Sequence, residues 1–236
     1  MGFDKRVDLL VRHIKGLQDF AFVGPEILTP YKNMGATIID GMLQAGIRHE
    51  TVVKPLLKKF LKIKKTEMTK GFYEVIKRTG NGNPVNGIKV LINRSDEEKP
   101  VRILGVVNYF LDEGIKIKED LNGWLTKPLS SIRFKKLRGV GNKTVDYFKN
   151  LCGIPNVAVD RWLIEFLNDA GIKIQIDSYH EAKKIIVKAA DKMNINRTLL
   201  DHSIWFYMSG GKRSNSCPSM FRKMVMQIIY FSILSG

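Results

Sequence analysis

A turn with two glycines, preceded by basic residues, is the part of this sequence best suited to bind an anion. It runs Leu137-Arg138-Gly139-Val140-Gly141-Asn142-Lys143-Thr144 and follows Lys135 and Lys136. Glycine permits tight turns and lets the backbone approach a ligand, and the N–H groups at a helix N-terminus attract phosphate. The pattern therefore predicts a helix, a glycine turn and a second helix that grip a phosphate. A plain connection between two helices is the alternative.

Two residues close to this turn have side chains that can take part in covalent chemistry. Lys143 falls in the first turn of the second helix, and Asp160, in Val159-Asp160-Arg161-Trp162, lies 17 positions further along. Taken alone, a helical lysine is usually a solvated charge, and an aspartate before an apolar run is usually an N-cap. Their occurrence together with the turn favours a functional pair.

The combined pattern resembles the helix-hairpin-helix (HhH-GPD) DNA glycosylase superfamily, of which endonuclease III is a member. In that superfamily Leu-x-Gly-Val-Gly-x-Lys-Thr is followed, after one helix, by Val-Asp, as at 137–144 and 159–160 here. The resemblance is close over 127–171, weaker over 30–60 and purely architectural elsewhere. It implies a base-excision enzyme that acts on double-stranded DNA containing a damaged base or an abasic site.

The resemblance also assigns roles to individual residues. Lys143 would attack C1′ of a flipped nucleotide and form a Schiff base, and Asp160 would stabilise positive charge on the sugar and assist proton transfer. A helix N-terminus and burial both favour the neutral amine that this attack needs. Subsequent β-elimination nicks the strand, so the enzyme would be a glycosylase with AP lyase activity. DNA contacts are expected from Lys136, Leu137, Arg138, Gly139, Val140, Gly141, Asn142 and Thr144.

A second, shorter motif lies near the N-terminus. The run Met42-Leu43-Gln44-Ala45-Gly46 resembles the Leu-x-x-Gln-x motif of the endonuclease III group. The resemblance implies that Gln44 binds DNA by entering the gap left by the flipped nucleotide. An exposed polar residue ending a helix before the glycine is the alternative reading.

The charge balance agrees with a polyanionic partner. There are 39 Lys and Arg residues against 23 Asp and Glu residues, a formal charge of +16. Such an excess favours nucleic acid, although RNA or an anionic membrane surface would also be compatible with it. No apolar run reaches the roughly 18–20 residues that span a bilayer, and the first residues, Met1 to Arg6, lack the apolar h-region expected of a signal peptide. We expect a monomeric intracellular protein, cytoplasmic or in the nucleoid, without a membrane partner.

The cysteine content argues against the cofactor that some of these enzymes carry. Cys152 and Cys217 are the only cysteines, and an iron–sulfur cluster needs four thiolates. We therefore expect no iron–sulfur cluster, and the scattered histidines predict no metal site. Cys152 lies on an apolar helical stripe and is expected to be a small core residue.

Apolar periodicity predicts an all-α protein with one domain over 1–236. By analogy with the superfamily, one lobe would comprise about 25–154, with the hairpin at 128–152, and the other about 1–24 plus 155–236. The helices expected first along the chain cover 4–22 and about 29–43, and a basic helix covers 52–63. Its lysines are expected to form a solvated face, with DNA contact as the alternative. A further apolar segment, 222–234, closes the chain.

The motifs do not specify which base is removed. Superfamily members with the Lys/Asp pair act on oxidised pyrimidines or on 8-oxoguanine, and the missing cluster favours the oxidised purine here. Oxidised pyrimidine is the nearest alternative, followed by thymine mispaired with guanine. Stacking on a flipped base is possible for Trp162, Trp205, Phe206 and Tyr207, although core packing is the expected role. A DNA-binding module without catalysis and a protein–protein scaffold are the alternatives of different class.

Overall fold

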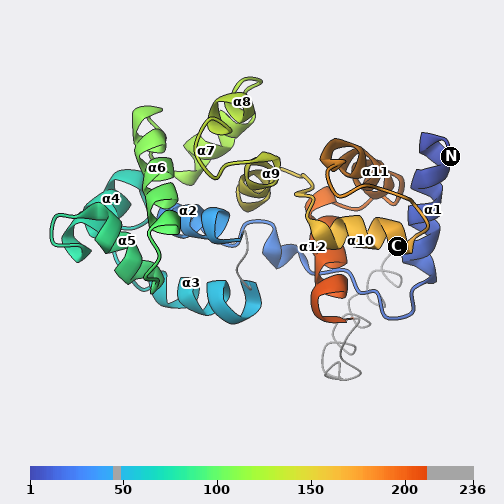
Figure 1. Ribbon diagram of the computed structural model, residues 1–236, viewed down its shortest axis with the longest axis horizontal. Coiled ribbons are helices and arrows are strands. Elements are labelled where there is room, and N and C mark those ends of the chain that lie inside the picture. The colour runs from blue at the N-terminus through green and yellow to red at the C-terminus, as the bar shows by residue number, and fades with distance from the viewer. Residues whose placement is uncertain (45–48, 212–236) are drawn as a thin grey trace, which may run out of the picture.

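A computed structural model describes residues 1–44 and 49–211, and within these ranges the protein is helical, with no strand (Figure 1). The all-α class expected from the periodicity is confirmed. The α-helices of the described residues are α1 (Phe3–Gly16), α2 (Met34–Leu43), α3 (Lys54–Phe60), α4 (Thr69–Thr79), α5 (Pro84–Ile92), α6 (Glu98–Asp112), α7 (Lys118–Leu125), α8 (Ser130–Phe134), α9 (Asn142–Leu151), α10 (Arg161–Asp169), α11 (Tyr179–Lys192) and α12 (Arg197–Phe206). The described residues also form a 3-10 helix, η1 (Pro25–Ile27), and two π-helices, η2 (His49–Val53) and η3 (Tyr207–Gly211).

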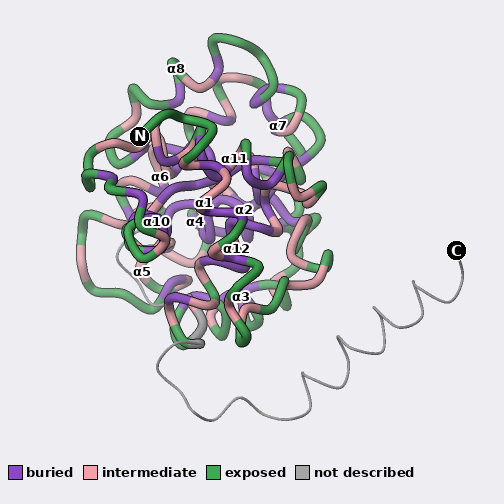
Figure 2. Tube along the Cα trace, turned by 90° about the vertical axis from the view of Figure 1, so that its right-hand side faces the viewer, coloured by how far each residue is buried: buried purple, intermediate pink, exposed green. Residues whose placement is uncertain are grey.

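The helices are arranged around two separate hydrophobic clusters. The first cluster uses residues from Met34 to Cys152, on α2 to α9, and we call this part the first lobe. The second combines α1 with residues from Val157 to Met208, on α10 to α12, and forms the second lobe. Figure 1 shows the lobes side by side, and Figure 2 shows that the buried segments gather toward the middle of the molecule and the exposed ones toward its rim. The chain starts in the second lobe, crosses to the first and returns after α9.

Helix α9 is held firmly in the first lobe by its apolar face. Val145, Phe148, Leu151 and Cys152 are all buried, as their spacing predicts. The Phe148 ring lies 5.2 Å from the ring of Phe134 on α8, in an edge-to-face contact. On its other side α2 approaches so closely that a Cβ at Gly41 would overlap the Phe148 ring. The position of the α9 N-terminus is therefore set by the core of the first lobe.

Helix α10, by contrast, begins in the second lobe. Val157 and Val159 are buried in the second cluster, so they anchor the extended segment that leads into the helix. Asp160 follows as the N-cap, and Leu163, Phe166 and Leu167 continue the apolar face. The segment that connects α9 to Asp160 therefore begins in the first lobe and ends in the second.

Some element boundaries differ from those expected. The first helix ends at Gly16 instead of Phe22, because Leu17 is extended and the Phe20 ring packs against Phe166 at 5.8 Å without helical periodicity. The second begins at Met34, where Asn33 accepts a hydrogen bond from the Ala36 N–H, and not near Thr29. The expected segment 222–234 and Cys217 lie outside the described residues.

Candidate active site

Lys143 and Asp160 face one another across the junction of the lobes. The Lys143 Nζ lies 3.6 Å from Oδ2 of Asp160, and their side chains are 33% and 13% exposed. The other carboxylate oxygen, Oδ1, accepts hydrogen bonds from the N–H groups of Trp162 at 2.9 Å and Leu163 at 3.2 Å. Asp160 therefore has both functions that its position allows: one oxygen caps α10 and the other faces the lysine.

The hairpin residues differ in how far they are available to a ligand. Lys136, Arg138, Gly139 and Gly141 are exposed, whereas Leu137 and Asn142 are half-buried. The side chains of Val140 and Thr144 are buried, so DNA could meet only the backbone of these two residues. Gly139 has a φ of +85°, a left-handed conformation that favours glycine. The turn is thus an exposed backbone loop that the buried Val140 side chain anchors to the first hydrophobic cluster.

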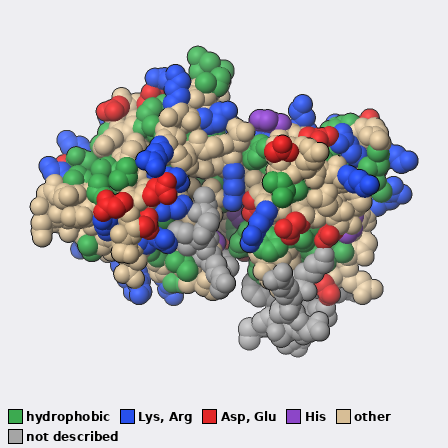
Figure 3. Space-filling view, viewed as in Figure 1, with side chains coloured by type: hydrophobic (Ala, Val, Ile, Leu, Met, Phe, Trp, Pro, Cys, Tyr) green, Lys and Arg blue, Asp and Glu red, His purple; other side chains and the backbone are tan. Residues whose placement is uncertain are grey.

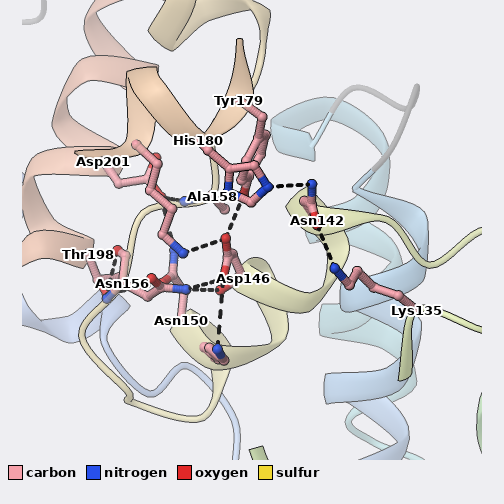
Figure 4. Close-up of polar contacts among 12 residues, drawn as sticks. Lys135, Asn142, Asp146, Asn150, Asn156, Ala158, Tyr179, His180, Thr198 and Asp201 are labelled. Carbon is pink, nitrogen blue, oxygen red and sulfur yellow. Dashed lines mark hydrogen bonds and ion pairs between the residues drawn. The ribbon is translucent and has the colours of Figure 1, made fainter. Parts of the chain in front are cut away.

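The hairpin also touches the second lobe through its polar residues. The Lys135 ammonium donates to Oδ1 of Asn142 at 3.1 Å, and the Asn142 amide nitrogen lies 3.4 Å from Nε2 of His180 on α11 (Figure 4). Arg138 is 3.4 Å from Glu98 on α6. The glycine turn therefore lies between α6 and α11 and is oriented by contacts on both sides.

Gln44 lies at the C-cap of α2, directly before the residues that the structure leaves undescribed. It is half-buried, and its Nε2 is buried without a hydrogen-bond partner in the described part of the chain. The Lys99 ammonium donates to the Met42 carbonyl at 3.2 Å and supports this helix end. Ala45 and Gly46 of the expected motif lie outside the described residues, so only its first three positions can be placed.

A buried polar network, which the sequence reading missed, joins α9 to the second lobe. Asp146 accepts from the Tyr179 hydroxyl at 2.7 Å, the Lys183 ammonium at 2.6 Å and the Asn156 amide at 2.7 Å (Figure 4). Burial, followed by the Asp146 carboxylate, raises the pKa of Tyr179, which remains a donor at neutral pH. Asp146 and Asn150 lie on the side of α9 opposite its apolar stripe, so periodicity gave no sign that they are buried.

A second buried carboxylate lies deeper in the same junction. Asp201 on α12 accepts from the Ala158 N–H at 2.8 Å and from the Asn150 amide at 3.0 Å. Burial raises the pKa of Asp201 to about 7. Thr198, one turn earlier, accepts from the Asn156 N–H at 3.1 Å and donates to Oδ1 of Asn150 at 3.2 Å. Sequence spacing gave no sign of these partners.

A third buried carboxylate lies on α2. Asp40 is 1% exposed, and its two oxygens accept from the Tyr31 hydroxyl at 3.2 Å and the Tyr147 hydroxyl at 3.3 Å. His49 Nε2 lies 3.3 Å from Oδ1 of Asp40. Burial, followed by the Asp40 charge, raises the pKa of Tyr147, so its hydroxyl stays protonated. Tyr147 is one helical turn after Lys143, which brings this polar cluster beside the candidate pair.

The aromatic residues considered for base stacking lie mainly against the second core. Trp162, Trp205 and Tyr207 are partly buried and pack on the second cluster, whereas Phe206 is 52% exposed. The Arg161 guanidinium lies 4.6 Å from the centre of the Trp162 ring, a cation–π contact. Core packing thus accounts for three of the four, and Phe206 has an open face.

The surface around the junction carries positive charge. Figure 3 shows a furrow between the two halves with Lys and Arg side chains beside it. The lysines on and beside α3 are all exposed: Lys54, Lys58, Lys59, Lys62, Lys64 and Lys65. An exposed basic surface of this kind attracts a polyanion and makes binding depend on salt.

Cys152 is the one cysteine among the described residues, and it lies in the core of the first lobe. Cys152 is buried, and burial raises the pKa of its thiol to about 12. Within 1–44 and 49–211 no group of three His, Cys, Asp or Glu residues is placed to hold a metal ion. The absence of an iron–sulfur cluster remains a prediction, since Cys217 is not described. No helix in these ranges is long and apolar enough to cross a membrane.

Comparison with solved structures identifies the fold. The chain is similar to an endonuclease III trapped as a covalent intermediate with DNA, with 19% identity, a TM-score of 0.57 and coverage of 92% of this chain and 93% of that one. It is similar to the Methanocaldococcus jannaschii 8-oxoguanine DNA glycosylase, with 15% identity, a TM-score of 0.53 and coverage of 89% and 86%. A third match is the H. pylori 3-methyladenine DNA glycosylase bound to 1,N6-ethenoadenine, with 15% identity, a TM-score of 0.56 and coverage of 90% and 98%.

These three matches show that the protein has the helix-hairpin-helix DNA glycosylase fold, as the hairpin motif predicts. At the level of sequence, the chain belongs to the family described as Domain of unknown function (DUF8548), whose model matches residues 26–209. A comparison with curated proteins gave no match.

Proposed function

We propose that this protein is a DNA base-excision glycosylase with AP lyase activity. The observation that carries the proposal is the 3.6 Å separation of Lys143 Nζ and Asp160 Oδ2, with the lysine one-third exposed beside a glycine hairpin. A flipped nucleotide held by its phosphate at the hairpin would bring its sugar to this pair. The glycosylase fold supports the same assignment, and double-stranded DNA with a damaged base or an abasic site is the proposed partner.

The proposed reaction assigns each side chain one task. The neutral Lys143 amine forms a bond to C1′ while the glycosidic bond breaks, and the base leaves with the bonding electron pair and gains a proton. Asp160 stabilises the positive charge that develops on the sugar and accepts the proton lost from the lysine nitrogen. The C1′–O4′ bond of the sugar then breaks while the proton held by Asp160 passes to O4′, which gives the Schiff base and acidifies the C2′ proton. Loss of that proton and departure of the 3′ phosphate then nick the strand.

We propose 8-oxoguanine as the substrate and oxidised pyrimidine or mispaired thymine as the alternatives. Trapping with borohydride tests both the mechanism and the substrate. Duplexes carrying an abasic site, 8-oxoguanine, an oxidised pyrimidine or a T·G mismatch are incubated with the protein and reduced. The expected result is a covalent protein–DNA band with the abasic and 8-oxoguanine duplexes that Lys143→Gln abolishes. Lys149→Gln, on the same helix, is the matched control and keeps the band.

The alternative of different class is a DNA-binding module without catalysis, in which Lys143 contacts a phosphate. It accounts for the charge and for the hairpin, but it gives no reason for an aspartate opposite the lysine. Tight duplex binding with no trapped band on any substrate would favour this alternative. A band with the abasic duplex alone would retain the lyase and direct the search to other lesions.

A further inference from the structure

Asp201 connects the two chain segments that carry the candidate pair. It lies on α12, is 5% exposed, and uses one oxygen, Oδ2, for both of its hydrogen bonds. One donor is the Asn150 side chain, on α9, and the other is the Ala158 backbone N–H, in the segment before α10 (Figure 4). A single atom therefore joins the first lobe to the start of the second lobe.

Each donor has a fixed relation to one member of the pair. Asn150 follows Lys143 by two helical turns, so the two side chains lie on the same side of α9. Ala158 precedes Asp160 by two residues, in a segment without helical hydrogen bonds of its own. Thr198 strengthens the same connection through the Asn156 N–H and Asn150. Movement of Asp201 would thus change the separation of the lysine and the aspartate.

We infer that Asp201 is a positioning residue that sets the distance between Lys143 and Asp160 without touching the substrate. The inference rests on the proposed function for its activity readout. Its burial excludes direct contact with DNA in this conformation. The hydrogen bonds that it accepts hold the backbone two residues before Asp160 and the helix that carries Lys143. A misplacement of about 1 Å costs about 100-fold in rate at an active site.

Asp201 is also placed to change the charge of this junction near neutral pH. Its pKa is raised to about 7 chiefly by burial, with the Asp160 charge also raising it and the Lys143 charge lowering it. The titratable groups that face it are Lys143 and Tyr147 on α9, Asp160 at the start of α10, and Tyr179 on α11. The carboxyl is mainly neutral at about pH 6 and mainly charged at about pH 8.

Because Asp201 accepts both hydrogen bonds with one oxygen, a substitution can remove its charge and keep its hydrogen bonds. In Asp201→Asn the amide oxygen can accept both hydrogen bonds, so the connection is kept while the titration is lost. Asp201→Leu keeps the approximate volume but leaves the Ala158 and Asn150 donors without an acceptor. Asp8→Asn, on an exposed carboxylate that pairs with Lys192, is the matched control for loss of one negative charge in the second lobe.

The experiment measures the single-turnover trapping rate and the duplex dissociation constant of the full chain. We expect Asp201→Leu to trap about 100-fold more slowly, with a dissociation constant within about twofold of wild type. Asp201→Asn should recover the rate to within about threefold at about pH 6. The ratio of wild-type to Asp201→Asn rates should then change with a midpoint near pH 7, whereas the Asp8→Asn ratio stays flat.

Three outcomes would overturn the inference: a wild-type rate in Asp201→Leu, an Asp201→Asn rate as low as that of Asp201→Leu at about pH 6, or a ratio independent of pH. If Asp201→Leu does not fold, Asp201→Asn alone still decides through its pH profile. A readout without catalysis separates this inference from the proposed function. The Lys143 side-chain NMR signal should show an inflection near pH 7 in wild type that Asp201→Asn lacks, even if no DNA is trapped.

Discussion

The Asp160 carboxylate divides its two oxygens between the Lys143 ammonium, 3.6 Å from Oδ2, and the first turn of α10, whose N–H groups bind Oδ1. The cap fixes the orientation of the carboxylate, because two backbone donors define its plane. The second oxygen is thereby held toward α9. The ordinary structural role of an N-cap and the proposed chemical role are therefore complementary in this residue.

The division of the two oxygens predicts that Asp160 substitutions separate stability from activity. Asp160→Asn keeps an oxygen for the cap, so its free energy of unfolding should stay close to wild type, while the trapping rate falls by about 100-fold or more because the charge is lost. Asp160→Ala should lose the same activity and also about 1 kcal/mol of stability. Urea unfolding and borohydride trapping measure the two effects. A wild-type trapping rate in Asp160→Asn would exclude the proposed role.

The two hairpin glycines should respond differently to alanine. Gly139 has a φ of +85°, and a Cβ there would lie 2.6 Å from the Arg102 side chain, so Gly139→Ala should cost about 2 kcal/mol of stability. Gly141 has a φ of −102° and an added Cβ would meet nothing within 4 Å. Gly141→Ala should therefore fold normally and lose only DNA affinity, because the methyl group holds the phosphate away from the backbone.

Fluorescence anisotropy with a labelled abasic duplex and thermal unfolding test this pair of variants. Normal affinity in a stable Gly141→Ala protein would show that DNA does not approach the hairpin backbone. A loss of stability in Gly141→Ala as large as that in Gly139→Ala would contradict the geometric distinction between the two positions.

The Asp146 network should contribute strongly to the association of the lobes. Asp146→Ala leaves the Tyr179 hydroxyl, the Lys183 ammonium and the Asn156 amide without their shared acceptor. We expect a loss of about 3 kcal/mol, since a buried group without its partner is more costly than an exposed ion pair. Lys183→Met should cost less, because Asp146 keeps its two neutral donors and Lys183 is partly exposed. Equal losses in the two variants, measured by urea unfolding, would contradict this account.

The sequence predicts those features that depend on local geometry. The hairpin, the apolar stripe of α9 and the position of Lys143 in a first helical turn all follow from glycine spacing and helical periodicity. The predicted end of α1 was wrong because the chain after Gly16 is not helical, although the apolar residues Phe20 and Phe22 continue the apolar pattern there. Phe20 packs against Phe166 and Phe22 from this non-helical segment, which periodicity cannot distinguish from a helix. Sequence patterns therefore predict local structure but not the boundaries that tertiary packing determines.

The polar networks were missed for a related reason. Asp146 and Lys183 are far apart in sequence, and Asp201 binds a backbone N–H at position 158, which leaves no trace in residue type. Asp146 and Asn150 lie opposite the apolar stripe of α9, so helical periodicity predicts exposure for them although both are buried. Spacing alone therefore locates the candidate pair, whereas the contacts that hold it in place require the folded chain.

The raised pKa of Asp201 also predicts how the free energy of unfolding depends on pH, independently of catalysis. Its folded pKa of about 7 lies above the unfolded value of about 3.9, so between these values the folded state binds the extra proton. Stability is then greatest below the unfolded pKa, falls as pH rises through this window, and levels off above the folded pKa. Asp201→Asn lacks the group and should lack this fall.

Urea unfolding of wild type and Asp201→Asn between about pH 4 and pH 8 measures the difference. As the pH is raised, the free energy of unfolding of Asp201→Asn should increase relative to that of wild type by up to a few kcal/mol, since one pKa unit corresponds to about 1.4 kcal/mol. Asp8→Asn should track wild type because Asp8 is exposed. Parallel curves for wild type and Asp201→Asn would mean that the carboxyl does not titrate in this window. The difference should level off just above the midpoint of the rate ratio, because both report the same proton.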